Sequence, residues 1–232
     1  MKEVETMTYS DYRRVARENL QGNWPLSIGV AALAWLLGGI LVGNAIIPQF
    51  TFHFRGEDLS LKDWLDLVLS YTHTYGNSTV TFSFLSLAQF ILGGVVQLGY
   101  ARYLLNQHNK ANFEFRDLFS QFDRFGQGFA QSFLRSLYIT LWTLLFIIPG
   151  IVKGYAYAMT PFIMAENPDM TANEAITASR ALMDGHKGEL FMLDLSFIGW
   201  DILAALTLNL GHLALNPYRN AAHAAFYKDI TA

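Results

Sequence analysis

Residues 141–166 read LWTLLFIIPGIVKGYAYAMTPFIMAE, an apolar run in which Lys153 is the one charged residue before the final glutamate. Proline removes a backbone hydrogen-bond donor and glycine accepts unusual torsions, so Ile147–Gly150 is typical of a turn. We therefore predict a helical hairpin across a membrane, with one helix over 133–148 and the next over 150–165. A single long helix that is kinked at the proline is the alternative.

Charged residues are also missing over two longer stretches, from 19 to 54 and from 67 to 101. A transmembrane helix needs about 20 mainly apolar residues to cross the hydrocarbon core. Both stretches meet that length, and the apolar C-terminal region has room for two further crossings. Outside the hairpin, we expect spans at about 26–47, 80–100, 189–207 and 211–227.

The composition agrees with this pattern, because 52% of the 232 residues are hydrophobic and 15% are charged, against about 25% charged in a typical soluble domain. The predicted fold class is all-α: a polytopic α-helical membrane protein with about six transmembrane helices as three hairpins, in one integral membrane domain over 1–232. Most of the 16 Lys and Arg residues fall in segments that face the cytoplasm in this arrangement, as the positive-inside rule requires. We expect a multi-pass protein of the cell (plasma) membrane with both termini cytoplasmic.

The same numbers bear on partners. A net charge of −3 and a pI near 6.0 provide no basic surface for nucleic acid. The expected partners are the lipid bilayer and a membrane protein partner, with the oligomeric state left open.

Three polar segments carry the periodicity of amphipathic helices, which lie at the headgroup level of a bilayer. We expect interfacial helices at about 8–22, 112–129 and 171–185, one before each hairpin. Thr171 and Glu174 form a capping-box pattern, and Thr8 and Asp11 form another. The first and third segments align at a constant offset, with the pairs Thr8/Thr171, Asp11/Glu174, Ala16/Ser179, Arg17/Arg180, Leu20/Met183 and Gly22/Gly185. This alignment indicates an internal repeat, for which plain duplication is the favoured explanation.

Four ionisable residues in the predicted spans are the candidate ion or proton site, since such residues are costly in a bilayer. Asp194 and Asp201 are seven apart, which places them on nearly the same face of a continuous helix. Lys153 and Arg219 are the available countercharges. The favoured alternative is that all four lie near headgroup depth or pair as buried structural contacts.

Catalytic and metal motifs are missing. The chain has no Cys, no HExxH, no phosphate-binding loop and no nucleophile elbow, so we predict no catalytic residue, metal or cofactor. The acidic and histidine side chains of Glu166, Asp184, His186 and Glu189 could hold a metal in a lipid-modifying enzyme. Helix capping and solvated charge are the preferred explanation of these four residues.

The C-terminal half resembles domain-of-unknown-function family 975, multi-span membrane proteins found chiefly in Gram-positive bacteria. The resemblance rests on the IPG turn at 148–150, on Ala175, Ser179, Met183 and Gly185, on 195–200, and on Pro217 and Tyr218. The opening ARENLQGNW, residues 16–24, also fits, so the resemblance extends over essentially the whole chain. A more distant likeness is to the membrane domain fused to some glycerophosphodiester phosphodiesterases, whose catalytic domain is absent here.

The family has no established biochemical role, so the function rests on the residues. The first hypothesis is a non-enzymatic integral membrane protein, acting as a scaffold, an accessory subunit or in envelope homeostasis. The alternative is a small transporter or channel that uses Asp194 and Asp201 with Lys153 and Arg219. Convergence of these four side chains on one water-accessible cavity would favour the transporter.

Overall fold

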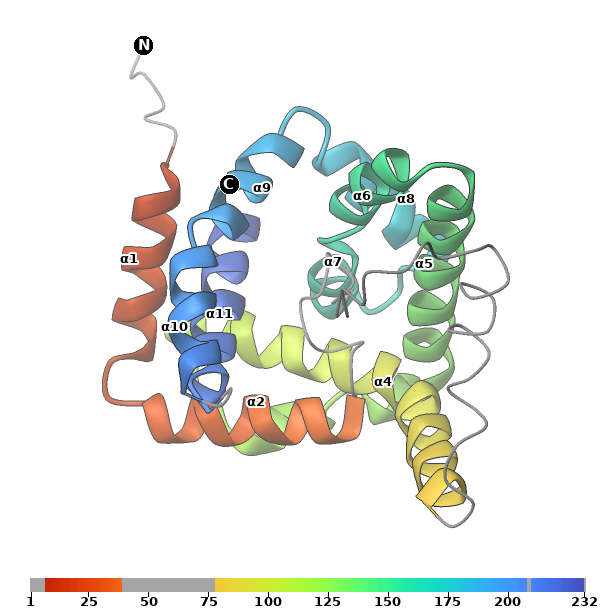
Figure 1. Cartoon of the computed structure of the whole chain (residues 1–232), viewed down its shortest axis with the longest axis horizontal. Helices are drawn as coiled ribbons and strands as arrows, with labels where there is room; N and C mark the ends of the chain where they lie inside the picture. The colour runs from red at the N-terminus through yellow and green to blue at the C-terminus, as the bar shows by residue number, and fades with distance from the viewer. Residues whose placement is uncertain (1–6, 39–77, 208–209, 232) are drawn as a thin grey trace, which may run out of the picture.

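The computed structural model describes residues 7–38, 78–207 and 210–231, and this part of the chain is helical with no strand. Figure 1 shows the helices packed around α4 and α11. The elements are α1 (Tyr9–Leu20), α2 (Trp24–Gly38), α4 (Ser78–His108), η3 (Phe115–Phe119), η4 (Phe122–Arg124), α5 (Phe125–Leu145), α6 (Ile147–Ala156), α7 (Thr160–Glu166), α8 (Ala172–Leu182), α9 (Lys187–Leu195), α10 (Ile198–Leu206) and α11 (His212–Ile230).

The prediction of an all-α protein agrees with these helices, but the prediction of transmembrane spans is wrong. Among the described residues, no helix combines the length and the apolar character that a bilayer crossing requires. This finding contradicts the polytopic membrane fold with six spans and, with it, the multi-pass plasma-membrane localisation and cytoplasmic termini.

The physical reason lies in breaks within the charge-free runs. The predicted span 150–165 is divided into most of α6 and most of α7, and the predicted span 189–207 into most of α9 and all of α10. These four helices have 10, 7, 9 and 9 residues, and at 1.5 Å per residue each rises about 10–15 Å, half or less of a hydrocarbon core of about 30 Å. The second half of the predicted span 26–47 lies outside the described residues.

The turn predicted at Ile147–Gly150 occurs one residue earlier. Phe146 has an extended backbone, with φ −157° and ψ 141°, and it separates α5 from α6. Pro149 lies in the first turn of α6, where its missing N–H breaks no helical hydrogen bond. Gly150 packs so closely on α5 that an added Cβ would lie 2.2 Å from Thr143 Oγ1. The chain is therefore divided here into two packed helices, and the single kinked helix is excluded.

The two repeated segments have the same local structure at both ends. The Asp11 carboxylate accepts a hydrogen bond from the Thr8 backbone N–H over 3.1 Å. The Glu174 carboxylate accepts one from the Thr171 backbone N–H over 2.8 Å. After each helix the chain turns at a glycine with positive φ, 79° at Gly22 and 89° at Gly185. Buried side chains also correspond, with Ala16 matched by Ser179 and Leu20 by Met183, all fully buried. The sequence alignment therefore corresponds to a repeated structural unit.

The third expected helix, over 112–129, is not a single helix. The segment forms η3 and η4, two short 3₁₀ turns, and then the start of α5. Its first turn is capped by Glu114 and Asp117 in a box that resembles those of α1 and α8. The turn η3 packs closely on α4, because an added Cβ at Gly99 would lie 2.0 Å from the Leu118 carbonyl oxygen. Phe115 and Phe119 of this segment are exposed.

The core lies along α4 and α11. The helix α4 packs against α2, α5 and α7, and α1 packs along α11, as Figure 1 also shows. Tyr12 of α1 meets Phe226 of α11 edge to face, with ring centroids 5.4 Å apart. Polar groups lie within this core as well: Gln107 donates to Ser27 over 2.9 Å, and Ser27 lies 3.0 Å from the Tyr103 hydroxyl.

Candidate functional site

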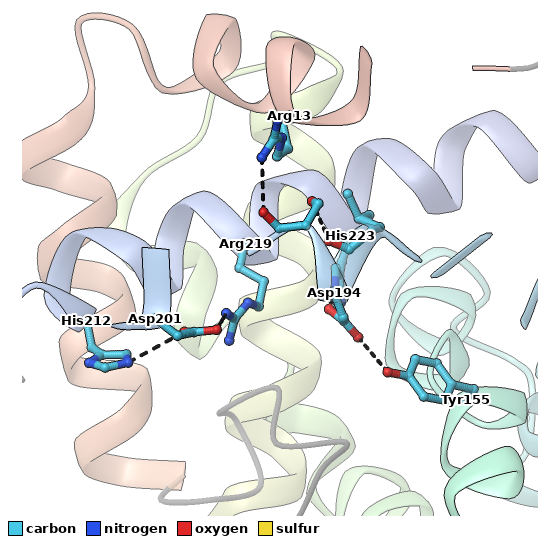
Figure 2. A network of polar contacts seen from close by, with 9 residues as sticks. Arg13, Tyr155, Asp194, Asp201, His212, Arg219 and His223 are labelled. Carbon is cyan, nitrogen blue, oxygen red and sulfur yellow. Dashed lines mark hydrogen bonds and ion pairs between the residues drawn. The ribbon is translucent and has the colours of Figure 1, made fainter. Parts of the chain in front are cut away.

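Asp194 lies near the end of α9 and joins three helices through its two carboxylate oxygens (Figure 2). Its Oδ1 lies 2.7 Å from His223 Nε2 on α11. Its Oδ2 accepts a hydrogen bond from the Tyr155 hydroxyl on α6 over 3.2 Å. The side chains of His223 and Asp194 are 3% and 16% exposed, so water has little access to this pair.

Asp201 on α10 forms a second pair with α11. Arg219 Nη2 lies 2.5 Å from Asp201 Oδ2, and His212 Nε2 lies 3.6 Å from Oδ1. The Arg219 guanidinium also stands 5.3 Å from the centroid of the Phe197 ring, which is completely buried. Both nitrogen partners therefore come from the N-terminal half of α11, as Figure 2 shows.

A bend between α9 and α10 separates the two aspartates. The chain turns at Ser196 and Phe197, and the Ser196 carbonyl accepts from Arg13 Nη1 of α1 over 3.1 Å. Asp194 and Asp201 consequently do not lie on one continuous helix, and each faces a different turn of α11. Within the described residues, Nε of Arg13 and Nε of Arg219 are buried without a hydrogen-bond partner.

The electrostatics keep Asp194 ionised. Burial alone would raise the pKa of its carboxyl, but His223, Arg219 and the Tyr155 hydroxyl outweigh burial and hold the pKa below the usual range. Burial, the Asp194 charge and the hydrogen bond to Asp194 all raise the pKa of the Tyr155 phenol, so this hydroxyl stays protonated as a donor.

Of the four candidate residues predicted from the sequence, the structure brings Asp194, Asp201 and Arg219 into one neighbourhood. Lys153 lies elsewhere, with its ammonium 4.8 Å from the centroid of the Trp142 ring. None of the four lines either of the two cavities described in this structure. The four side chains therefore do not converge on one cavity.

Sequence reasoning missed Tyr155, His212 and His223. His223 follows Arg219 by four residues, and this spacing places both on one face of a helix. That signal was present in the sequence. No local pattern connects Tyr155 to Asp194, because the two residues meet only through the packing of α6 on α9.

The acidic cluster considered for a metal-dependent enzyme is not assembled. His186 Nδ1 lies 3.0 Å from Glu189, and Asp184 pairs with Lys187 at 3.1 Å. Glu166 lies apart from these residues, where it pairs with Lys228 and accepts from the Tyr227 hydroxyl over 2.8 Å. The described residues contain no group of three His, Asp or Glu side chains that could hold a metal ion.

Chemically, this network is a set of closed ion pairs. Both Asp194 oxygens are engaged by donors from other helices, and both Asp201 oxygens face a nitrogen of α11. This leaves no carboxylate poised toward an open cavity as a general base. In the described residues, the arrangement defines a helical protein whose C-terminal half is connected by charged pairs. The pair of Asp194 with His223 is buried, and the pair of Asp201 with Arg219 is partly exposed.

Residues 144–232 match the model of the family described as Protein of unknown function (DUF975), which supports the resemblance noted above over this part of the chain. The match contains every labelled residue of Figure 2 except Arg13. It covers less of the chain than the resemblance noted above, and the likeness to the glycerophosphodiester phosphodiesterases is not found. No curated protein and no solved structure matches the chain.

Proposed function

We propose that this protein is a non-enzymatic scaffold or accessory protein that contacts lipid through an exposed apolar surface. The proposal concerns contact between that surface and lipid, and it includes no segment that crosses a bilayer. One observation carries it: large apolar side chains face outward over several helices while charged pairs are held inside.

The exposed apolar surface is extensive. Ile148 and Leu206 are 75% and 76% exposed, and Leu144 is 74% exposed. Ordinary soluble proteins rarely expose contiguous apolar areas of more than a few hundred Å². The most exposed members of this surface are Trp35, Leu144, Leu145, Phe146, Ile147, Ile148, Ile202, Leu203, Leu206 and Leu210.

The distribution of these side chains favours lipid over a single protein partner. They lie on α2, on the α5–α6 turn and on α10 with the turn that follows it. In Figure 1, α2 lies along the bottom of the molecule, α5 along the right and α10 toward the left. A docking partner covers one face, whereas acyl chains can cover apolar side chains that point in several directions.

The ionisable side chains support the same conclusion. Asp194 pairs with His223 and Asp201 with Arg219, so these charges are compensated within the protein. The side chains capable of acid–base chemistry are engaged with one another, which supports a role without catalysis.

Acyl-chain contact can be measured with tryptophan quenching. Variants that keep Trp200 alone, with the other four tryptophans changed to Phe, are mixed with vesicles whose acyl chains carry bromine. Trp200 is 52% exposed on α10, so we expect bromine to remove most of its emission. The matched control keeps Trp24 alone, because Trp24 packs against Tyr218 with ring centroids 6.4 Å apart and should lose less. Equal quenching of the two variants, or none in either, would overturn the proposal.

A further inference from the structure

A small cavity of about 250 Å³ lies between α5, α6 and α8, away from the ion-pair network. Tyr138 and Trp142 of α5 form one wall, and Tyr157, directly after α6, forms another. The third wall is the polar face of α8, with Asn173, Thr177 and Arg180. These last three residues are four and three apart, so they line one side of the helix.

Hydrogen-bond donors dominate this lining. A guanidinium, a side-chain amide, three hydroxyls and an indole N–H belong to the six residues named. The Tyr138 hydroxyl donates to Asn173 Oδ1 over 3.3 Å. That contact uses the Tyr138 proton and the Asn173 carbonyl oxygen, so the Asn173 NH₂ group and the other donors of the lining remain for a ligand.

The charge in the cavity is positive and uncompensated. Arg180 is exposed and forms no ion pair with any residue that the structure describes. Glu174, the acidic residue of the same helix, is held by Thr171 in the capping box. Burial raises the pKa of the Tyr157 phenol while the Arg180 charge opposes that shift, which places the guanidinium close to the hydroxyl.

A second cation stands at the same wall. The Lys153 ammonium lies 4.8 Å from the centroid of the Trp142 ring, so Trp142 has one cation over its ring and shares the cavity with another. Lys153, which takes no part in the ion-pair network, therefore lies beside the cavity.

We propose that this cavity binds the phosphate group of a phosphate ester. Arginine matches the oxygens of phosphate in a bidentate geometry, and charge-assisted hydrogen bonds of this kind are the strong ones. Donors that approach from α5, from α8 and from the turn after α6 suit a tetrahedral anion better than a planar carboxylate. The volume leaves room for the first atoms of the esterified group.

The phosphate could belong to a lipid headgroup or to a free phosphate ester. Leu144 and Leu145, both exposed, follow Trp142 along the same helix beyond the cavity, where the chains of a lipid would lie. The inference does not depend on the proposed function, because a soluble phosphate ester would occupy the cavity without any contact between the protein and acyl chains.

The test uses the fluorescence of Trp142, kept as the single tryptophan of the full chain. It is titrated with inorganic phosphate, with glycerol 3-phosphate and with dihexanoyl phosphatidic acid below its micellar concentration. We expect a saturable change with at least one probe, and binding weaker by about tenfold or more in the Arg180→Gln variant. Saturation by glycerol 3-phosphate indicates a free ester, and saturation by the phosphatidic acid alone indicates a lipid headgroup.

The matched control is Arg116→Gln, since Arg116 is also exposed and lies on η3, outside the cavity. It should bind like the unsubstituted protein, and circular dichroism should report equal helix content in both variants. The absence of saturation with all three probes, or equal affinity in the two variants, would overturn the inference. The quenching of Trp200 by brominated lipid is a separate measurement. It can contradict the proposed lipid contact without contradicting the phosphate site, and the titration of Trp142 can do the reverse.

Discussion

Replacing Asp194 by alanine should strongly destabilise the fold. The substitution leaves His223 and the Tyr155 hydroxyl without the acceptor that both share. Hydrogen bonds to charged groups contribute about 1.5–3 kcal/mol each, and removing one partner of a buried pair costs about 3–5 kcal/mol. Since the Asp194 side chain is only 16% exposed, little water can replace it. We expect the free energy of unfolding to fall by about 3–4 kcal/mol.

The matched control is Asp184→Ala. Asp184 forms an ion pair of similar length with Lys187, at 3.1 Å, but its side chain is 86% exposed. Exposed pairs contribute about 0–1 kcal/mol, so this variant should unfold almost like the unsubstituted protein. Both variants are measured by equilibrium unfolding followed by circular dichroism. The reasoning is refuted if Asp194→Ala and Asp184→Ala have the same effect.

The same residue predicts a dependence on pH. The folded-state pKa of Asp194 is depressed, so the unfolded chain takes up this proton at a higher pH than the folded one. The stabilisation is therefore fully present above the ordinary aspartate pKa of about 3.9 and is lost as the pH falls through the folded-state value. The Asp194→Asn variant should lose less stability than the unsubstituted protein between about pH 5 and pH 2. Parallel acid profiles for the two proteins would contradict this assignment.

Three further substitutions test the packing and one partly buried contact. Gly150→Ala would place a Cβ 2.2 Å from Thr143 Oγ1 and 2.8 Å from its Cα, so we expect a loss of about 1–3 kcal/mol in unfolding free energy. Gly126→Ala meets open space on α5 and should be neutral or stabilising, by up to about 1 kcal/mol. Tyr12→Phe removes the hydroxyl that donates to Asp229 over 2.6 Å. It should cost about 1–2 kcal/mol and speed amide hydrogen exchange at the end of α11, and unchanged exchange there would contradict this contact.

The helix ends of the repeat could be predicted because their signals are local. A capping box places donor and acceptor within four residues, as in Thr8 with Asp11 and Thr171 with Glu174. Glycine at a positive φ likewise depends on one position, here Gly185. The same kind of box at Glu114 was overlooked because the residues after it form 3₁₀ turns, whose side-chain spacing does not follow the helical period.

The predicted spans at 150–165 and 189–207 failed because a largely apolar run need not form one helix, whereas α4 runs unbroken over 80–100. Residues 133–165 have two charges, Arg135 and Lys153, yet the backbone breaks at Phe146 and again after Ala156. Glycine and proline made the first break predictable. The second, at Tyr157–Met159, comes just before Pro161 in the first turn of α7. Proline has no N–H to continue a helix from α6 and clashes with the carbonyl four residues earlier, so this break also had a local signal.

For the candidate site, the sequence could supply the ionisable residues but not their pairing. Asp194 and Asp201 were chosen because they were expected in apolar spans, and both are indeed shielded and paired. Their partners lie on α11, and only the tertiary fold determines which residue of that helix each aspartate meets. Lys153 was assigned as a countercharge by sign alone and instead lies over an aromatic ring.

The pairing also explains how a protein with apolar side chains on both its inside and its outside selects one packing. Burial of apolar area discriminates weakly between such arrangements, because a shifted helix still meets apolar neighbours. Asp194 meets His223 and Asp201 meets Arg219, one turn apart on α11. A shift of α11 by one turn in one direction would bring Arg219 opposite Asp194 and Leu215 opposite Asp201. A charged carboxylate beside a buried leucine has no partner, and burying an unpaired charge is costly. The two pairs therefore fix the register of α11 against α9 and α10, which is the property that a scaffold requires of its interior.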